Sequence, residues 1–176
     1  MEIALFTVGI LQVCFILNFS LNNAAQVKFT NVVCNSYNKS WMLIHRCHLK
    51  AINRNKTVLN FNGTVLHPAN DITVESQFSL KANGYKPWLY KPKFDVCRFL
   101  KKPYNPIVIL AYNLVKNFTN FNHTCPYVGS QIVDGLHILY DTVPVPWPSG
   151  EFLLEIDWLF EKRLQFSTNV YFTVVE

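Results

Sequence analysis

The chain has 176 residues, of which half are hydrophobic and 15% are aromatic. This composition excludes an intrinsically disordered protein and suits one domain with a sizeable core. The formal net charge is +5, but no nucleic-acid-binding motif accompanies it, so we expect no nucleic acid partner. The sequence also lacks a Gly-x-Ser-x-Gly elbow, a phosphate loop and a His-Glu-x-x-His motif. We therefore expect neither an enzyme nor a cofactor or metal site.

Residues 1–25 have the pattern of an export signal. An apolar run extends from Ile3 to Phe19, and small residues follow at Ala24 and Ala25, where we expect cleavage. The alternative is an uncleaved anchor, but a run of about 17 residues is at the short limit for a membrane span. We expect residues 26–176 to form one secreted domain.

Cleavage of the signal would remove Cys14 and leave four cysteines, which are Cys34, Cys47, Cys97 and Cys125. An even number in an exported chain predicts two disulfides, and four cysteines allow three pairings. We favour Cys34–Cys47 and Cys97–Cys125, because these partners are nearest in sequence. A metal site is the weaker alternative, because the chain has no Cys-x-x-Cys pair.

Sequons also indicate export. After the predicted signal, five positions fit the Asn-x-Ser/Thr pattern, and we predict glycosylation there: Asn38, Asn55, Asn62, Asn117 and Asn122.

The first half of the chain reads as a series of strands. Strands are predicted over 27–34 and 41–52, on either side of a turn, and over 57–67, with a bulge near Gly63. The next strand, 72–81, alternates between a dry face and a polar face, which is typical of an antiparallel sandwich. Asn83-Gly84 predicts a hairpin turn. The strand that follows, 85–94, contains two prolines and should lie at an edge.

One helix is predicted between Cys97 and Cys125, over about 105–118. Asn105 is a good N-cap, and Pro106 suits the first helical position. Apolar residues then recur at helical spacing, and we expect this face to be buried: Ile107, Leu110, Ala111, Leu114, Val115 and Phe118.

After the helix, strands are predicted over 131–140, 152–160 and 164–173, with Glu161-Lys162 as the last turn. The proline-rich stretch 143–150 should be a stiff connection, and its Trp147 either packs on a neighbouring strand or closes the end of a cavity. The pattern as a whole predicts a mostly β fold. Its architecture is a two-sheet antiparallel, Ig-like sandwich of about eight strands with one inserted helix.

Four short motifs stand in a fixed order: Cys47-His-Leu-Lys-Ala-Ile-Asn53-Arg54, Asn83-Gly84-Tyr85, Phe94-Asp95-Val-Cys97 and Asn122-His-Thr-Cys125-Pro126-Tyr127. In these the chain resembles the insect family of small exported proteins called domain of unknown function 1091, and it is similar to the chemosensory CheB proteins. That family is in turn similar to the ML superfamily of lipid-recognition proteins, whose sheets part to hold a lipid. The resemblance implies an ML-type sandwich that carries a lipid or a hydrophobic chemosensory ligand. The resemblance does not assign a ligand contact to any particular residue.

Apolar residues on the dry faces of the predicted strands are the candidates for lining such a cavity: Ile72, Val74, Phe78, Leu80, Phe152, Leu154, Ile156, Trp158, Phe160, Phe166 and Phe172. The alternative is that these side chains fill a solid core. The protein would then be an extracellular interaction module, accessory to a receptor or channel.

Seven cations lie between Lys81 and Lys102: Lys81, Lys86, Lys91, Lys93, Arg98, Lys101 and Lys102. They form either an ordinary solvated surface or a patch for a membrane receptor or an anionic surface. Nothing in the sequence indicates an oligomer, and we expect a monomer.

Overall fold

The computed structural model describes residues 26–54, 56–89, 91–143 and 147–175. The predicted signal, residues 1–25, and the sequon at Asn55 lie outside the described residues. The described chain folds mostly into β-strands, which form two antiparallel sheets, as the sequence predicted. None of its helices is long and apolar enough to cross a membrane within the described ranges.

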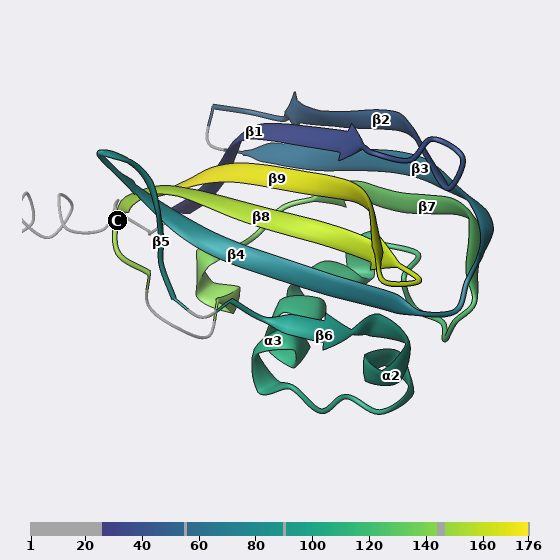
Figure 1. Ribbon diagram of the computed structural model, residues 1–176. Helices are drawn as coiled ribbons and strands as arrows, with labels where there is room; N and C mark the ends of the chain where they lie inside the picture. Colours follow the sequence, from purple (N-terminus) through teal and green to yellow (C-terminus); the bar gives the residue numbers. More distant parts are fainter. Residues whose placement is uncertain (1–25, 55, 90, 144–146, 176) are drawn as a thin grey trace, which may run out of the picture.

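The larger sheet has six strands, and the smaller has three (Figure 1). The large sheet has the order β1 (Gln26–Ser36), β9 (Arg163–Val175), β8 (Gly150–Phe160), β4 (Ile72–Ala82) and β5 (Gly84–Pro87), and β6 (Lys93–Asp95) also pairs with β4. The small sheet has the order β2 (Met42–Ala51), β3 (Thr57–Ala69) and β7 (Tyr127–Leu136).

The core lies between these sheets. The small sheet contributes Met42 and Val65, and the large sheet contributes Phe152 and Val174, all of them fully or almost fully buried. The chain therefore follows the layered arrangement in which the apolar faces of two sheets bury each other.

The first two strands belong to different sheets, although they flank a short turn. β1 pairs with β9 in the large sheet, whereas β2 pairs with β3 in the small one. A disulfide between Cys34 and Cys47 joins these strands, which confirms the first predicted pairing. The turn thus carries the chain from one layer to the other, and the disulfide ties the layers together.

Prolines divide the predicted strand 85–94 into β5 and β6, and both pair with β4. The expectation of an edge position is therefore confirmed, but the single strand is not. The predicted hairpin turn is also confirmed, because β4 and β5 pair directly on either side of Asn83. The bulge expected near Gly63 falls on the facing strand, where His45 is the extra residue of β2.

Two helices lie between β6 and β7. They are α2 (Val96–Lys101) and α3 (Pro106–Val115), and the short 3-10 helix η1 (Lys116–Phe118) continues α3. Asn105 caps α3 as predicted, since its Oδ1 accepts hydrogen bonds from the backbone N–H groups of Ile107 and Val108. α2 was not predicted. It begins where Asp95 Oδ1 accepts from the backbone N–H of Arg98 at 2.8 Å.

The predicted buried face of α3 is wrong. Val108 is buried, while Ile107 is 48% exposed and Leu110 is 42% exposed. The physical reason is that α3 is apolar around most of its circumference, so the spacing of its apolar residues does not select one face. Packing decides instead, with Tyr112 turned toward Phe99 of α2 at a ring distance of 5.7 Å.

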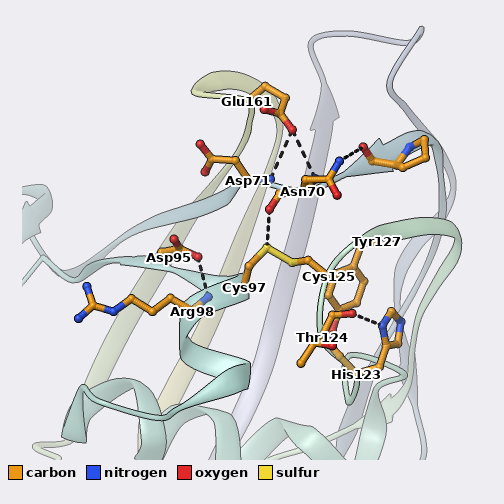
Figure 2. The surroundings of a disulfide bond; sticks show 11 residues. Asn70, Asp71, Asp95, Cys97, Arg98, His123, Thr124, Cys125, Tyr127 and Glu161 are labelled. Carbon is orange, nitrogen blue, oxygen red and sulfur yellow. Dashed lines mark hydrogen bonds between the residues drawn. A yellow bond between two sulfur atoms is a disulfide. The ribbon is translucent and has the colours of Figure 1, made fainter.

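The second predicted disulfide, Cys97–Cys125, is also confirmed, and it links α2 to the segment before β7 (Figure 2). Cys97 Sγ lies 3.1 Å from the carbonyl oxygen of Asn70. Glu161, in the β8–β9 turn, accepts hydrogen bonds from the backbone N–H groups of Asn70 and Asp71. The disulfide therefore fixes the helical segment beside the turns at one end of the sandwich.

The strand predicted over 131–140 lies four residues earlier, as β7. It ends after Gly135, which has a φ of +64°, and the 3-10 helix η2 (Tyr140–Thr142) begins the connection to β8. A left-handed glycine and a helical turn are not compatible with a regular strand that continues to Tyr140.

Candidate functional site

The predicted cavity residues share the inner face of the large sheet. The pairing register of β4, β8 and β9 places them in cross-strand rows, such as Leu80–Phe152–Phe172 and Val74–Trp158–Phe166. Six of them are buried: Ile72, Val74, Phe152, Phe160, Phe166 and Phe172. The other five are half-buried: Phe78, Leu80, Leu154, Ile156 and Trp158.

A cluster of aromatic rings covers the end of this face where β8 begins. Trp147 is at its centre, with ring centroids 5.0 Å from Phe152, 5.2 Å from Phe78 and 5.5 Å from Phe172. Trp88, which follows β5, contacts Trp147 and Phe152, each at 5.3 Å. Trp147 therefore packs on neighbouring strands, which is one of the two arrangements considered for it. We call these five rings the Trp147 cluster.

A second aromatic cluster lies further along the same strands. Trp158 stacks on Phe166 with centroids 5.2 Å apart and planes 5° apart. Phe61 of the small sheet stacks on the same Phe166, and Phe121 contacts Trp158 at 6.1 Å. We call these four rings the Trp158 cluster. It brings the two sheets into direct contact at this level.

Between the two clusters, the inner face of the large sheet carries a row of half-buried residues. Ser76, Ile156 and Thr168 form one cross-strand row, from three strands that have neighbours on both sides. All three are half-buried, and Ile156 is absent from the side chains that pack against the core. Inward residues of central strands are normally buried, because protein interiors are close-packed. The row is therefore less completely buried than Phe152 and Phe160 of the same face.

Two indole groups on this face have unpaired donors. The Nε1 atoms of Trp147 and Trp158 are buried, and neither has a hydrogen-bond acceptor among the described residues. Buried donors are paired in the large majority of cases. The two indole N–H groups are therefore buried donors without a partner among the described residues.

Ionisable groups contribute little to the site. Three His, Cys, Asp or Glu side chains that could share a metal ion are not found together anywhere in the described ranges. Burial raises the pKa of Tyr127 to about 12. Its hydroxyl donates to the carbonyl oxygen of His123, so its surroundings suit a structural hydrogen bond.

The predicted cationic patch is divided by ion pairs. Lys81 pairs with Glu151 and Lys93 pairs with Glu75, each at 2.7 Å. The carboxylate of Glu151 raises the pKa of Lys81, and the hydrogen bond from Lys93 lowers the pKa of Glu75. Each pair has one member on β4, and three of the five other cations, Arg98, Lys101 and Lys102, lie in or directly after α2.

Four of the five sequons fall on described residues. Asn117 and Asn122 are exposed, whereas Asn38 and Asn62 are half-buried. Asn38 Oδ1 accepts hydrogen bonds from the backbone N–H and the hydroxyl of Ser40, the third residue of its own sequon. Glycosylation stays a prediction at all five positions.

Sequence comparison adds a family likeness. None of the curated proteins matches the chain. The chain does match the model of one protein family over residues 74–154, from β4 into β8, a stretch that includes Cys97, Cys125 and the helices between them. Over these residues the chain is similar to the family described as "Protein of unknown function (DUF1091)".

Proposed function

We propose that this protein is an exported, glycosylated member of that family. On this proposal, it holds a lipid or another hydrophobic small molecule between its two sheets, without chemical turnover. The likeness over residues 74–154 supports the family. The class of ligand follows from the resemblance to lipid-recognition sandwiches that the sequence motifs imply. The observation that carries the proposal is the half-buried row of Ser76, Ile156 and Thr168 on the inner face.

The surroundings of this row suit an elongated apolar guest. Leu154 and Phe78 lie beside it, and aromatic clusters stand at both ends. Small-molecule sites usually combine such apolar walls with a few convergent polar groups. Phe152 and Trp158 are about 20 Å apart at 3.3 Å per residue of strand, which sets an upper limit on the length of a guest along β8.

The two unpaired indole donors favour a guest that is not a pure hydrocarbon. Trp147 Nε1 and Trp158 Nε1 belong to opposite clusters, so each would meet one end of an elongated ligand. A fatty acid, an ester or a long-chain alcohol carries an oxygen acceptor at one end. Pairing that oxygen with a buried N–H relieves the cost of an unsatisfied donor.

Export is supported by the pattern of covalent cross-links and sequons. Two disulfides link elements of the sandwich, and such bonds persist in oxidising compartments. The exposed sequons Asn117 and Asn122 leave room for sugars on the surface. These features agree with the apolar segment at residues 3–19, which lies outside the described part of the chain.

The proposal is tested by ligand uptake in the secreted, folded protein. Native mass spectrometry detects a copurified lipid, and a fluorescent fatty acid measures affinity. The variant Ile156→Phe should fill the proposed space between the sheets and weaken uptake by about tenfold or more. The matched control is Ile52→Phe, because Ile52 is 52% exposed at the end of β2.

The alternative interaction module with a solid core gives the opposite pattern. The wild-type protein would take up neither the fatty acid nor a hydrocarbon. Ile156→Phe would then overpack the interior and lower the free energy of unfolding by about 1–3 kcal/mol. On the carrier proposal the same variant should keep its stability, so unfolding and uptake together distinguish the two functions.

A further inference from the structure

A long stretch of this chain is basic without any acidic residue. From Val96 to Val133, which includes α2, α3 and η1, the sequence contains no Asp or Glu and has four cations: Arg98, Lys101, Lys102 and Lys116. All four side chains are exposed, and no described residue forms an ion pair with any of them. The segment therefore has a charge of +4 with no internal compensation.

The same segment exposes an apolar surface. Ile107 and Leu110 lie three residues apart on α3 and are 48% and 42% exposed, and Ala111, on the same side, is exposed as well. Tyr104, just before the helix, is 42% exposed, and the Arg98 guanidinium lies 4.7 Å above its ring. We call Tyr104, Ile107, Leu110 and Ala111 the α3 apolar face. Grouped apolar side chains on a surface indicate an interaction site.

The helix that presents this face is held firmly from behind. Val108 and Tyr112 occupy its opposite side, where Val108 is buried and Tyr112 contacts Phe99. Tyr112 also donates a hydrogen bond to the carbonyl oxygen of Phe121 at 3.0 Å. Figure 1 shows α2, α3 and β6 together on one side of the molecule, beside β4 and away from the small sheet. The α3 apolar face is therefore a fixed and accessible part of the surface.

We propose that the α3 apolar face docks on a lipid membrane that contains anionic headgroups. An interfacial helix needs apolar side chains for the acyl boundary and cations at the level of the headgroups. Here Ile107 and Leu110 of α3 supply the first, while Arg98 and Lys101 of α2 and the next residue, Lys102, supply the second. Lysine and arginine reach outward from an apolar surface while their heads stay hydrated.

Charge complementarity selects the anionic bilayer as the occupant. The four cations outnumber the two acidic residues that flank the segment, Asp95 and Asp134, so an anionic surface is attracted to it. This docking goes beyond ligand binding between the sheets and does not depend on it, because the α3 apolar face is on the outside.

The test is co-sedimentation of the secreted, full-length folded protein with vesicles. One set is phosphatidylcholine alone, and the other contains equal parts of phosphatidylcholine and phosphatidylserine. We expect binding to the anionic vesicles only, and we expect added salt to weaken it, since salt screens surface charge. The double variants Ile107→Ser/Leu110→Ser and Lys101→Glu/Lys102→Glu should each weaken binding by about tenfold or more.

Two control variants change the same chemistry elsewhere. Ile52→Ser removes an exposed apolar residue just after β2, and Lys39→Glu/Lys50→Glu reverses two exposed lysines. Both should bind as the wild type does. Equal binding to the two kinds of vesicle, an unchanged Ile107→Ser/Leu110→Ser variant, or an equal loss in the Lys39→Glu/Lys50→Glu control would overturn the proposal. Capture of a soluble protein in place of vesicles would do the same.

Discussion

Phe61 of β3 and Phe166 of β9 stack across the two sheets, with ring centroids 6.2 Å apart and ring planes 13° apart. Both rings are buried, and no ladder of backbone hydrogen bonds joins β3 to β9. The contact between the layers at this level therefore depends on side-chain packing. The Cys34–Cys47 disulfide provides the covalent link between the layers.

The first prediction concerns this stacked pair. Phe61→Ala should lower the free energy of unfolding by about 3–5 kcal/mol, because it leaves a cavity between two layers that cannot easily collapse. Urea denaturation measures the loss. Leu164→Ala is the matched control, since Leu164 is 40% exposed at the start of β9 and should change stability by no more than about 0.5 kcal/mol. Equal losses in the two variants would contradict the role of the pair.

The second prediction concerns the disulfide of Figure 2. Cys97→Ser/Cys125→Ser opens a loop whose ends are 28 residues apart in sequence, which costs roughly 3–4 kcal/mol by the loop-entropy model. Because α2 is short and depends on this link, its amide protons should exchange faster in the variant. Hydrogen exchange read by mass spectrometry checks this, with β8 as the internal reference. Unchanged exchange in α2 would show that packing alone holds the helix.

The sequence was sufficient for the elements that have one apolar face. The inward positions of β4, β8 and β9 are mostly apolar, so most of their inward residues could be identified from period-two spacing. The start of α3 was also predictable, because a capping Asn followed by Pro is a local signal.

Contacts between distant segments were not visible in the sequence. Tyr85 of β5 and Tyr171 of β9 are in ring contact at 5.6 Å, although β4 and β8 lie between their strands. Their rings therefore meet on the outer face of the sheet, where Ser79 and Leu153 are also buried. Only the tertiary structure brings these two distant tyrosines together. The outer face of β4 is therefore more apolar than the alternation of its own residues predicted.

The candidate site was predictable in part. The eleven apolar residues share one face, as expected, but Trp88 and the polar members of the middle row were missed. Ser76 and Thr168 occupy inward positions of otherwise apolar strand faces. A polar residue at such a position is itself a signal, since a filled core would usually carry an apolar residue there.

The third prediction uses the close approach of β2 and β3. A Cβ added at Gly63 would meet Met42 Cε and would lie 2.9 Å from the carbonyl oxygen of Leu43. The methionine can move, but the backbone carbonyl cannot, so Gly63→Ala should lower the free energy of unfolding by about 1–3 kcal/mol. Gly150→Ala is the control, because its nearest neighbour is the flexible end of Leu80 at 3.3 Å. Denaturation midpoints of the two variants should therefore differ clearly.

The fourth prediction concerns alkaline pH. Burial raises the pKa of Tyr127 to about 12, above its ordinary value of 10.0. The unfolded chain therefore loses this proton before the folded chain does, and the stability that Tyr127 contributes is present below pH 10 and lost as the pH rises toward 12. Tyr127→Phe should be less stable at neutral pH, because it loses the hydrogen bond to His123. It should also show a shallower decline above pH 10. Parallel declines in denaturation experiments would contradict the assignment.

The last prediction separates the two parts of the Trp158 side chain. Trp158→Phe keeps an aromatic ring to stack on Phe166 but removes the indole N–H, which has no acceptor among the described residues. Removing an unpaired buried donor should leave the stability of the ligand-free protein unchanged or slightly higher. If that N–H binds an oxygen of the guest, affinity for a long-chain alcohol should fall by up to about tenfold, in line with the net value of one hydrogen bond. Affinity for a hydrocarbon of equal length should stay the same. Competition against a fluorescent fatty acid measures both affinities, and an equal loss for the two ligands would assign the effect to ring packing instead of the N–H group.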